Sequence, residues 1–238
     1  MALWLYGFMA NNDLAELESK IGIKFKNQDL LSQALTHRSY INENPDWHLD
    51  HNERLEFLGD AVLELVVTEY LYNKFPDPEG ELTSWRAALV NAIILARISS
   101  KIDLDSFLLL SRGEAKDIGR ARQYILANAM ESLIGAIYLD RGYDTCKEFI
   151  EKFILGELPA ILEEGAHKDY KSRLQEQAQE RIGITPTYEV LREWGPDHAK
   201  SFHIGVYLGQ ELVGEGNGPS KQDAQQVAAK DGLEKKGW

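Results

Sequence analysis

Hydrophobic residues recur every three to four positions along the first two-thirds of the chain, a spacing typical of amphipathic helices. Polar turns separate these stretches, and regular two-residue alternation is absent from them. The predicted helices cover residues 14–25, 30–35, 50–73, 82–101, 121–142 and 143–162. The prolines of Pro76-Asp-Pro-Glu-Gly80 separate the third helix from the fourth, because proline interrupts helical hydrogen bonding. The pattern therefore predicts an all-α domain over residues 12–164.

The pattern changes after a short hinge at Gly165–Lys168. Apolar positions that step by four over residues 170–182 predict one amphipathic helix, and three strand-like runs follow it. The strands are expected over residues 187–194, 201–208 and 211–216. A last helix is expected from Ser220. Residues 168–237 are therefore predicted to form a small α+β domain of order α-β-β-β-α, with both helices on one face of the sheet.

The sequence NERLEFLGDAVL at residues 52–63 lies in the third predicted helix, which an Asp50/Glu53 capping box is expected to start. Its carboxylates fall within about 80° of one another on a helix that advances 100° per residue. These carboxylates belong to Glu53, Glu56, Asp60 and Glu64. The apolar residues expected to be buried on the opposite side are Leu55, Leu58, Ala61, Val62 and Leu65. Stacked carboxylates repel one another unless a cation or a basic partner lies between them.

A second polar pair, Asn128 and Glu131, lies one helical turn apart among apolar residues, where polar groups need a partner. Three or four hard oxygen ligands suit Mg²⁺ or Mn²⁺, which favour phosphate substrates. Zinc is disfavoured because neither cluster has Cys or His at ligand spacing. From spacing alone, a metal site and an ordinary solvated acidic face remain equal alternatives.

The net charge of −12 over 238 residues argues at first against a nucleic-acid partner. Residues 168–238, however, hold ten Lys/Arg and eleven Asp/Glu, so the excess acid lies in residues 1–167 with the carboxylate clusters. A single cysteine, Cys146, excludes an intramolecular disulfide and favours a reducing compartment, so a cytoplasmic location is expected. No apolar run reaches the roughly 20 residues of a membrane span.

Several motifs resemble the bacterial ribonuclease III family in order and spacing. HNERLEFLGDAVLE at 51–64 resembles its signature, with support from Thr36-His-Arg-Ser-Tyr40, Pro78–Thr83 and Ile125–Asp140. Asp169–Glu176 and Gly216–Lys221 resemble its double-stranded-RNA-binding domain. The resemblance covers roughly residues 14–236. It implies a nuclease domain over 12–164 and an RNA-binding domain over 168–237.

The family resemblance also implies roles for single residues. The residues that match its metal-binding and catalytic positions are Glu56, Asp60, Asn128 and Glu131. Asp60 and Glu131 would be tied most directly to cleavage. Glu53 matches an acid that lines the same valley and the dimer interface. Glu79 matches an acidic loop position near the scissile strand, although a plain exposed turn explains it equally. Phe57 matches a residue that plugs into the partner subunit, and core packing is the alternative.

Asn128 departs from the family pattern, which usually has Asp at this position. Its amide oxygen can still bind a hard cation, but it carries no charge and cannot act as a base. Asn128 is therefore predicted to bind the metal ion through its carbonyl oxygen. Weaker metal binding, reduced activity or a preference for Mn²⁺ would follow.

The resemblance also implies how duplex RNA would be bound, by contacts to its minor groove and phosphates. The implied contact residues are Ser172, Gln175 and Glu176 on one groove, His198 and Lys200 in a loop on the next, and Ser220 and Lys221 at a phosphate-binding helix start. A plain N-cap at Ser220 and a plain loop residue at His198 are the alternatives. The family often has lysine where this chain has Gln222, Gln225 and Gln226, which predicts modest RNA affinity.

The favoured interpretation is a homodimeric, Mg²⁺-dependent endoribonuclease that cuts double-stranded RNA, with Mn²⁺ able to substitute. As the resemblance implies, its products would carry 5′-phosphates, 3′-hydroxyls and short 3′ overhangs, and its substrates would be ribosomal RNA precursors and structured messages. One alternative is a duplex-RNA-binding dimer that lost turnover through Asn128. Another is an all-α phosphohydrolase of small molecules with the tail as an interaction module.

Overall fold

The computed structural model describes residues 14–164, 169–196 and 200–238. The chain divides into two compact units, residues 1–167 and 168–238. The first is helical, and the second has the order α-β-β-β-α, so the predicted fold class is confirmed. Within the described ranges, no helix combines the length and the hydrophobicity needed to span a membrane.

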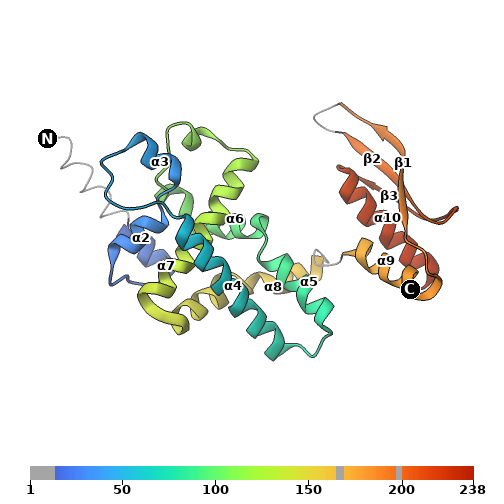
Figure 1. Ribbon diagram of the computed structural model, residues 1–238, viewed down its shortest axis with the longest axis horizontal. Helices are drawn as coiled ribbons and strands as arrows, with labels where there is room; N and C mark the ends of the chain where they lie inside the picture. Colours follow the sequence, from blue (N-terminus) through green and yellow to red (C-terminus); the bar gives the residue numbers. More distant parts are fainter. Residues whose placement is uncertain (1–13, 165–168, 197–199) are drawn as a thin grey trace. The chain divides into compact units, whose positions relative to one another are not determined.

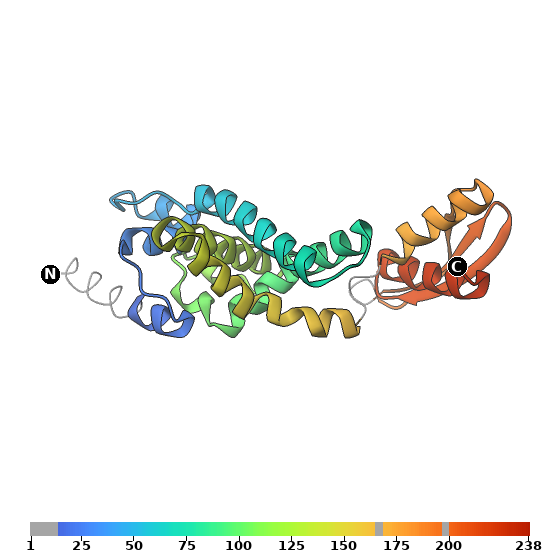
Figure 2. The same cartoon turned by 90° about the horizontal axis from the view of Figure 1, so that it is seen from below.

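The first unit is built around two long helices, α4 and α7, which make its most extensive helix–helix contact (Figures 1 and 2). Its helices are residues 14–21, α2 (Gln28–Ala34), α3 (Arg38–Glu43), α4 (Glu53–Lys74), α5 (Glu79–Leu89), α6 (Ala92–Lys101), α7 (Arg120–Phe153) and α8 (Leu158–Glu164). Short 3₁₀ turns lie at Leu104–Phe107, Glu114–Lys116 and Leu155–Glu157. Leu63 and Val66 of α4 pack with Met130, Leu133 and Ile137 of α7 in one core.

Three of the expected helices differ in extent from the prediction, and the first of them, expected over 14–25, ends at residue 21. The stretch 82–101 is not one helix, because α5 ends at Leu89 and Asn91 caps the start of α6: its Oδ1 accepts a hydrogen bond of 3.0 Å from the Ile94 amide. Asparagine is a favourable N-cap, and it interrupts a helix without changing the apolar spacing. The break expected after residue 142 is present as a kink at Gly142, at φ +83°. The second half of α7, however, ends at Phe153 rather than 162.

The second unit contains, within its described residues, a three-stranded antiparallel sheet of order β1-β2-β3. Its elements are α9 (Tyr170–Ile182), β1 (Thr187–Trp194), β2 (Ser201–Leu208), β3 (Glu211–Gly218) and α10 (Lys221–Lys236). Leu174 of α9, Val206 of β2 and Leu233 of α10 belong to one buried cluster, so both helices pack on the same face, as predicted. Gly183 ends α9 at φ +68°, in the left-handed region that glycine tolerates.

Glycines on β3 allow α10 to lie directly on the strand. A Cβ atom on Gly216 would lie 2.3 Å from the backbone nitrogen of Ala228, and one on Gly214 would lie 2.4 Å from the Ala228 oxygen. Both distances are shorter than real Cβ contacts, so these positions need glycine. The small core of this unit therefore depends on backbone contact between a strand and a helix.

Candidate metal and active site

The site lies where α4 and α7 cross at backbone contact. A Cβ atom on Gly59 would lie 1.7 Å from the Glu131 backbone oxygen, and one on Gly135 would lie 2.2 Å from the Leu55 oxygen. Only glycine fits at either position, and this places Asp60 beside Glu131. Neither glycine stands out from the helical periodicity of the sequence. A glycine inside a helix lowers helix stability by about 1 kcal/mol relative to alanine, so a glycine in a helical sequence pattern can indicate a packing role.

A buried serine fixes the start of α4 against α7. The Ser132 hydroxyl is wholly buried and lies 2.8 Å from the Asn128 backbone oxygen and 3.3 Å from the Asn52 oxygen. Its single proton is shared between these two acceptors. Asn52 is also held from the other side, because its backbone nitrogen donates to the Thr36 oxygen at 2.9 Å. The first turn of α4 is thus anchored to two other segments of the unit.

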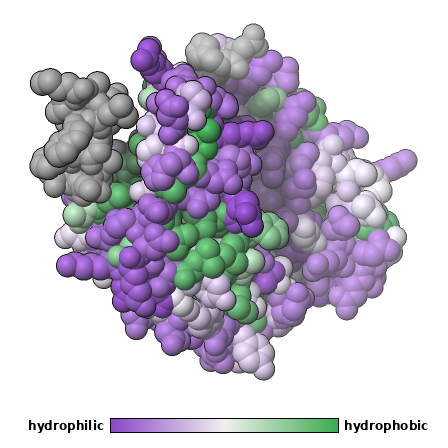
Figure 3. Space-filling view, turned by 60° about the vertical axis from the view of Figure 1, so that its left-hand side comes forward, coloured by the Kyte–Doolittle hydropathy of each residue, from purple (hydrophilic) through white to green (hydrophobic). Residues whose placement is uncertain are grey.

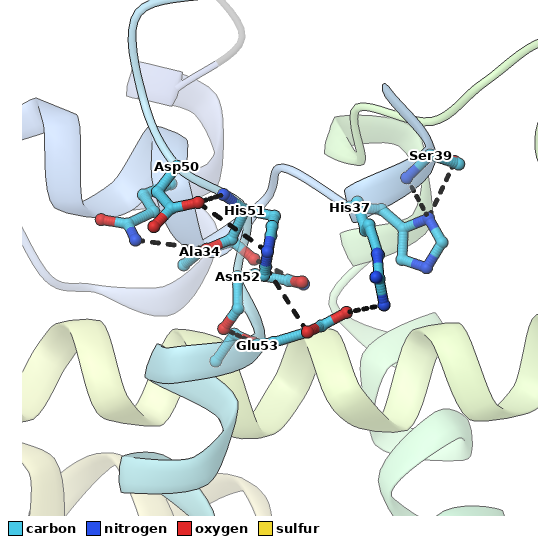
Figure 4. Close-up of polar contacts among 10 residues, drawn as sticks. Ala34, His37, Ser39, Asp50, His51, Asn52 and Glu53 are labelled. Atoms are coloured by element: carbon cyan, nitrogen blue, oxygen red, sulfur yellow. Dashed lines mark hydrogen bonds and ion pairs between the residues drawn. The ribbon is translucent and has the colours of Figure 1, made fainter. Parts of the chain in front are cut away.

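The start of α4 differs from the predicted capping box (Figure 4). Asn52 is the N-cap, without a side-chain cap hydrogen bond, and Asp50 Oδ1 accepts from the His51 amide at 2.9 Å. Asp50 lies too far before the helix to cap it. Glu53 lies 3.3 Å from the Arg38 guanidinium, which partly neutralises its carboxylate, and His51 Nδ1 lies 3.8 Å from it.

Three carboxylates and one amide face one another across the crossing of α4 and α7. Burial, then the charges of Asp60 and Glu56, raise the pKa of Glu131 to about 7. Burial and the charge of Glu53 also raise the pKa of Glu56, and a hydrogen bond from the Asn128 side chain opposes that shift. The site therefore gathers negative charge in a partly desolvated place, where a cation would be stabilised.

The donor chemistry of this cluster fits a hard divalent cation. Carboxylate and amide oxygens are the ligands that Mg²⁺ and Mn²⁺ prefer. Among the residues that the structure describes, no three Asp, Glu, His or Cys side chains already converge as a finished metal site.

Glu79 does not join this cluster within one chain. It lies in the first turn of α5, where it accepts a hydrogen bond of 3.0 Å from Thr83, rather than in the expected loop. Asp60 and the end of α4 at Lys74 are already about 21 Å apart along the helix axis, at 1.5 Å per residue.

Phe57 is 81% exposed, which contradicts core packing as its explanation. The predicted burial of Ala61 and Leu65 is also wrong: both are exposed, Leu65 by 57%. Together with Tyr72, which is 77% exposed, these residues form an apolar stripe along one face of α4. Exposed hydrophobic residues interrupt a largely hydrophilic surface on the face drawn in Figure 3.

An apolar pocket lies at the end of this stripe, in the corner between α4 and α5. It has a volume of about 660 Å³. Its apolar lining comes from Leu71, Tyr72, Phe75, Pro76 and Leu82, and Glu79 also borders it. The stripe and the pocket share Tyr72, and Thr68 and Arg86 also line the pocket.

The predicted RNA-binding residues of the second unit lie mostly on its surface. Ser172, Gln175 and Glu176 are exposed on α9, although the Ser172 hydroxyl also donates to Asp169 at 2.7 Å. Lys200 Nζ lies 3.9 Å from Glu193 before β2. His198 lies outside the described residues.

The start of α10 is held by Ser220, whose hydroxyl oxygen accepts the Asp223 amide at 3.1 Å. Lys221 follows it, exposed, with its ammonium 5.7 Å from the Phe202 ring centre. Gln225 and Gln226, which replace expected lysines, bind the start of α9: Gln225 accepts from Lys171 Nζ at 2.6 Å, and Gln226 donates to Asp169 at 2.9 Å.

Comparison with known proteins identifies the family. A family model described as ribonuclease-III-like matches residues 27–158, and one described as a double-stranded RNA binding motif matches residues 170–236. The chain belongs to the ribonuclease III family. The members of this family are metal-dependent.

Curated relatives cover nearly the whole chain. Ribonuclease 3 of Natranaerobius thermophilus is 48% identical over 91% of this chain and 94% of its own length. Ribonuclease 3 of Nitratiruptor is 45% identical over 92% and 95%. A solved structure of the ribonuclease III nuclease domain of Campylobacter jejuni is 43% identical over 60% of this chain and 97% of its own, with a TM-score of 0.55.

Proposed function

We propose that this protein is a Mg²⁺-dependent endoribonuclease that hydrolyses phosphodiester bonds of double-stranded RNA, with a catalytic domain over residues 12–164 and an RNA-binding domain over 168–237. The carboxylate cluster at the α4–α7 crossing carries the proposal, because it joins hard oxygen donors in a ribonuclease III fold. The relatives named Ribonuclease 3 support the activity. Nothing in them favours the non-catalytic alternative or a small-molecule phosphohydrolase.

In this proposal Glu56, Asp60, Asn128 and Glu131 hold the ion. The ion would supply an acidified water and neutralise charge on the scissile phosphate. Glu131 holds a proton up to about pH 7 in the metal-free protein, and it must release that proton to bind as a carboxylate. Asn128 orients Glu56 through its hydrogen bond and offers its amide oxygen. Glu53 and Glu79 are accessory acids.

We propose further that the enzyme is a homodimer that pairs through the apolar stripe. An antiparallel pairing of two α4 helices about Leu65 would place Phe57 opposite the partner's Tyr72, because these positions lie about 12 and 10 Å from Leu65 along the axis. Phe57 would then enter the pocket between α4 and α5 of the partner. Glu79, which borders that pocket, would come close to the partner's Glu56 and Asp60.

The second unit would hold the duplex by shape through the exposed residues of α9, Lys200, the His198 loop and the start of α10, where Ser220 and Lys221 favour phosphate. Products with 5′-phosphates, 3′-hydroxyls and short 3′ overhangs are expected. Ribosomal RNA precursors and structured messages are the proposed substrates.

Incubation of the full chain with end-labelled duplex RNA tests the activity. We expect cleavage with Mg²⁺ or Mn²⁺, none with a chelator, and none from Glu131→Gln, which should still bind RNA. Glu151→Gln, an exposed glutamate of the same helix, is the matched control and should cut normally. Near-normal turnover by Glu131→Gln would refute its role, and binding without products in either metal would refute the activity.

A further inference from the structure

A second hollow lies in the nuclease unit where residues 21–24 meet the half of α7 that follows the Gly142 kink. Its volume is about 530 Å³, within the roughly 300–1,000 Å³ of small-molecule sites. Ile23 and Phe149 form a buried apolar floor. No candidate catalytic residue lines it, and Glu131 and Thr145 lie 14 positions apart on α7. The hollow is therefore separate from the carboxylate cluster.

Cations dominate the rim of this hollow. Lys24, Arg141 and Lys152 line it, against the single acid Glu148, in a chain whose net charge is −12. The Arg141 guanidinium donates to the Lys24 backbone oxygen, which holds two of the cations on one side. On the other side of the hollow, Lys152 Nζ lies 3.9 Å from the position that a Cβ atom on Gly22 would occupy.

Some cations of the unit are neutralised: Lys20, Arg97, Lys101, Arg122 and Lys147 each form an ion pair with Asp or Glu. Among the described residues, Lys24, Arg141 and Lys152 make no such ion pair. Three like charges around one hollow repel one another, and an anion between them would remove that repulsion.

The shape and chemistry of the lining restrict the kind of anion. A guanidinium, two ammonium groups and the Thr145 hydroxyl suit a phosphoryl group, which offers several acceptor oxygens. The hollow is much larger than a bare phosphate, and its floor is apolar. We propose that it binds the phosphate monoester of a nucleotide, either free or at the 5′ end of an RNA strand.

Binding there has a structural consequence. The occupant would connect the segment 21–24 to the second half of α7, so it would stabilise the folded nuclease unit and raise its melting temperature. This proposal is independent of the proposed cleavage activity, because none of the lining residues belongs to the candidate site.

Calorimetric titration of the full, metal-free chain with AMP at constant ionic strength tests the proposal. We expect binding of AMP, no binding of adenosine, and at least a tenfold loss of AMP affinity in the Lys24→Ala/Lys152→Ala double variant. The matched control Lys26→Ala/Lys116→Ala removes two other exposed lysines and should bind as the native chain does. All four lysines are exposed, and equal melting temperatures without AMP would verify that both variants fold.

The possible outcomes are distinct. Equal AMP affinity in the two double variants, equal binding of adenosine, or no binding at millimolar AMP would each overturn the proposal. A short single-stranded RNA with and without a 5′-phosphate separates the two sources: preference for the phosphorylated strand over AMP identifies an RNA end, and the reverse identifies a free nucleotide. Cleavage of duplex RNA by the Lys24→Ala/Lys152→Ala variant should be unchanged.

Discussion

Both units of this chain depend on glycines that let two backbones touch, but the contacts serve different ends. At Gly59 and Gly135, α4 meets α7 so closely that carboxylates from both helices are drawn together against their mutual repulsion. At Gly214 and Gly216, β3 meets α10, and the contact completes a small apolar core. The α4–α7 contact lowers electrostatic stability but forms the candidate metal site. The β3–α10 contact only adds apolar packing.

The largest expected effect comes from Gly59→Ala. Its new methyl group would lie 1.7 Å from the Glu131 oxygen and force α4 from α7. We expect a loss of about 3 kcal/mol in the free energy of unfolding and undetectable cleavage, measured by denaturant titration and the labelled-duplex assay. Gly80→Ala, which has open space around it, is the control and should change neither.

Gly216→Ala sharpens the contrast between the units. Its methyl group would press on α10, so we expect weaker RNA binding while the nuclease unit keeps its affinity for Mn²⁺. Loss of metal affinity in this variant, or a fully active Gly59→Ala protein, would show that the two contacts do not have separate roles.

The pH dependence of metal binding probes the electrostatic cost at the first contact. Because the pKa of Glu131 is raised to about 7, this carboxyl is protonated below that pH. The proton then competes with the metal ion for the carboxyl oxygens. We expect Mn²⁺ affinity to fall by up to roughly tenfold per pH unit below 7. Isothermal titration at several pH values measures it, and a flat profile would contradict the coupling.

The same raised pKa predicts a change in stability without metal. The protonated form is favoured in the folded state, so stability is full at low pH and decreases as pH rises through about 7. Glu131→Gln removes this loss and should therefore raise the melting temperature at pH 8 more than at pH 5. Equal shifts at both pH values would rule out Glu131 as the source.

Asn128→Asp adds a fourth carboxylate to the crossing and replaces the hydrogen bond to Glu56 by repulsion. We expect Mn²⁺ affinity to rise by about tenfold, since one more anionic ligand favours a hard cation, and the metal-free protein to melt lower. Titration calorimetry and thermal melting measure the two changes. Unchanged affinity would mean that the native amide does not limit binding.

The smallest expected effect concerns the RNA-binding unit. Gln222 is exposed near the start of α10, and Gln222→Lys would add one phosphate contact. We expect RNA affinity to rise a few-fold and the slope of its salt dependence to steepen by about 0.7 to 0.9. Filter binding at several salt concentrations tests this, with Gln210→Lys in the β2–β3 turn as a control that should bind as the native chain does.

Periodicity predicted the fold class because each unit buries one regular face of its elements. Periodicity gave wrong helix boundaries and wrong burial where hydrogen bonds or surface exposure, rather than core packing, determine a residue's position. Asn91 splits a predicted helix through a local cap hydrogen bond. Asn52 rather than Asp50 begins α4, where hydrogen bonds to the distant Thr36 and Ser132 hold its backbone. Leu65 has the spacing of a core residue but is exposed, since spacing cannot distinguish a chain's own core from an apolar patch on its surface.

The candidate site shows the same division. The spacing of Glu56 and Asp60 placed them on one helix face, and the family resemblance joined them to Glu131. Neither revealed that Gly59 and Gly135 set the distance between the helices, because contacts between distant segments leave no periodic signal. The position of Glu79 on α5, beyond the end of α4, could also be seen only in the folded chain.

The ring of Phe57, left 81% in water, bears on how the protein would behave as it is diluted. Such a surface is costly to keep in water, and in the proposed homodimer it becomes buried when two chains meet. Far below the dissociation constant of that pairing, the paired fraction decreases in proportion to the total protein present. Specific activity per molecule would then decline with dilution, and added protein would restore it.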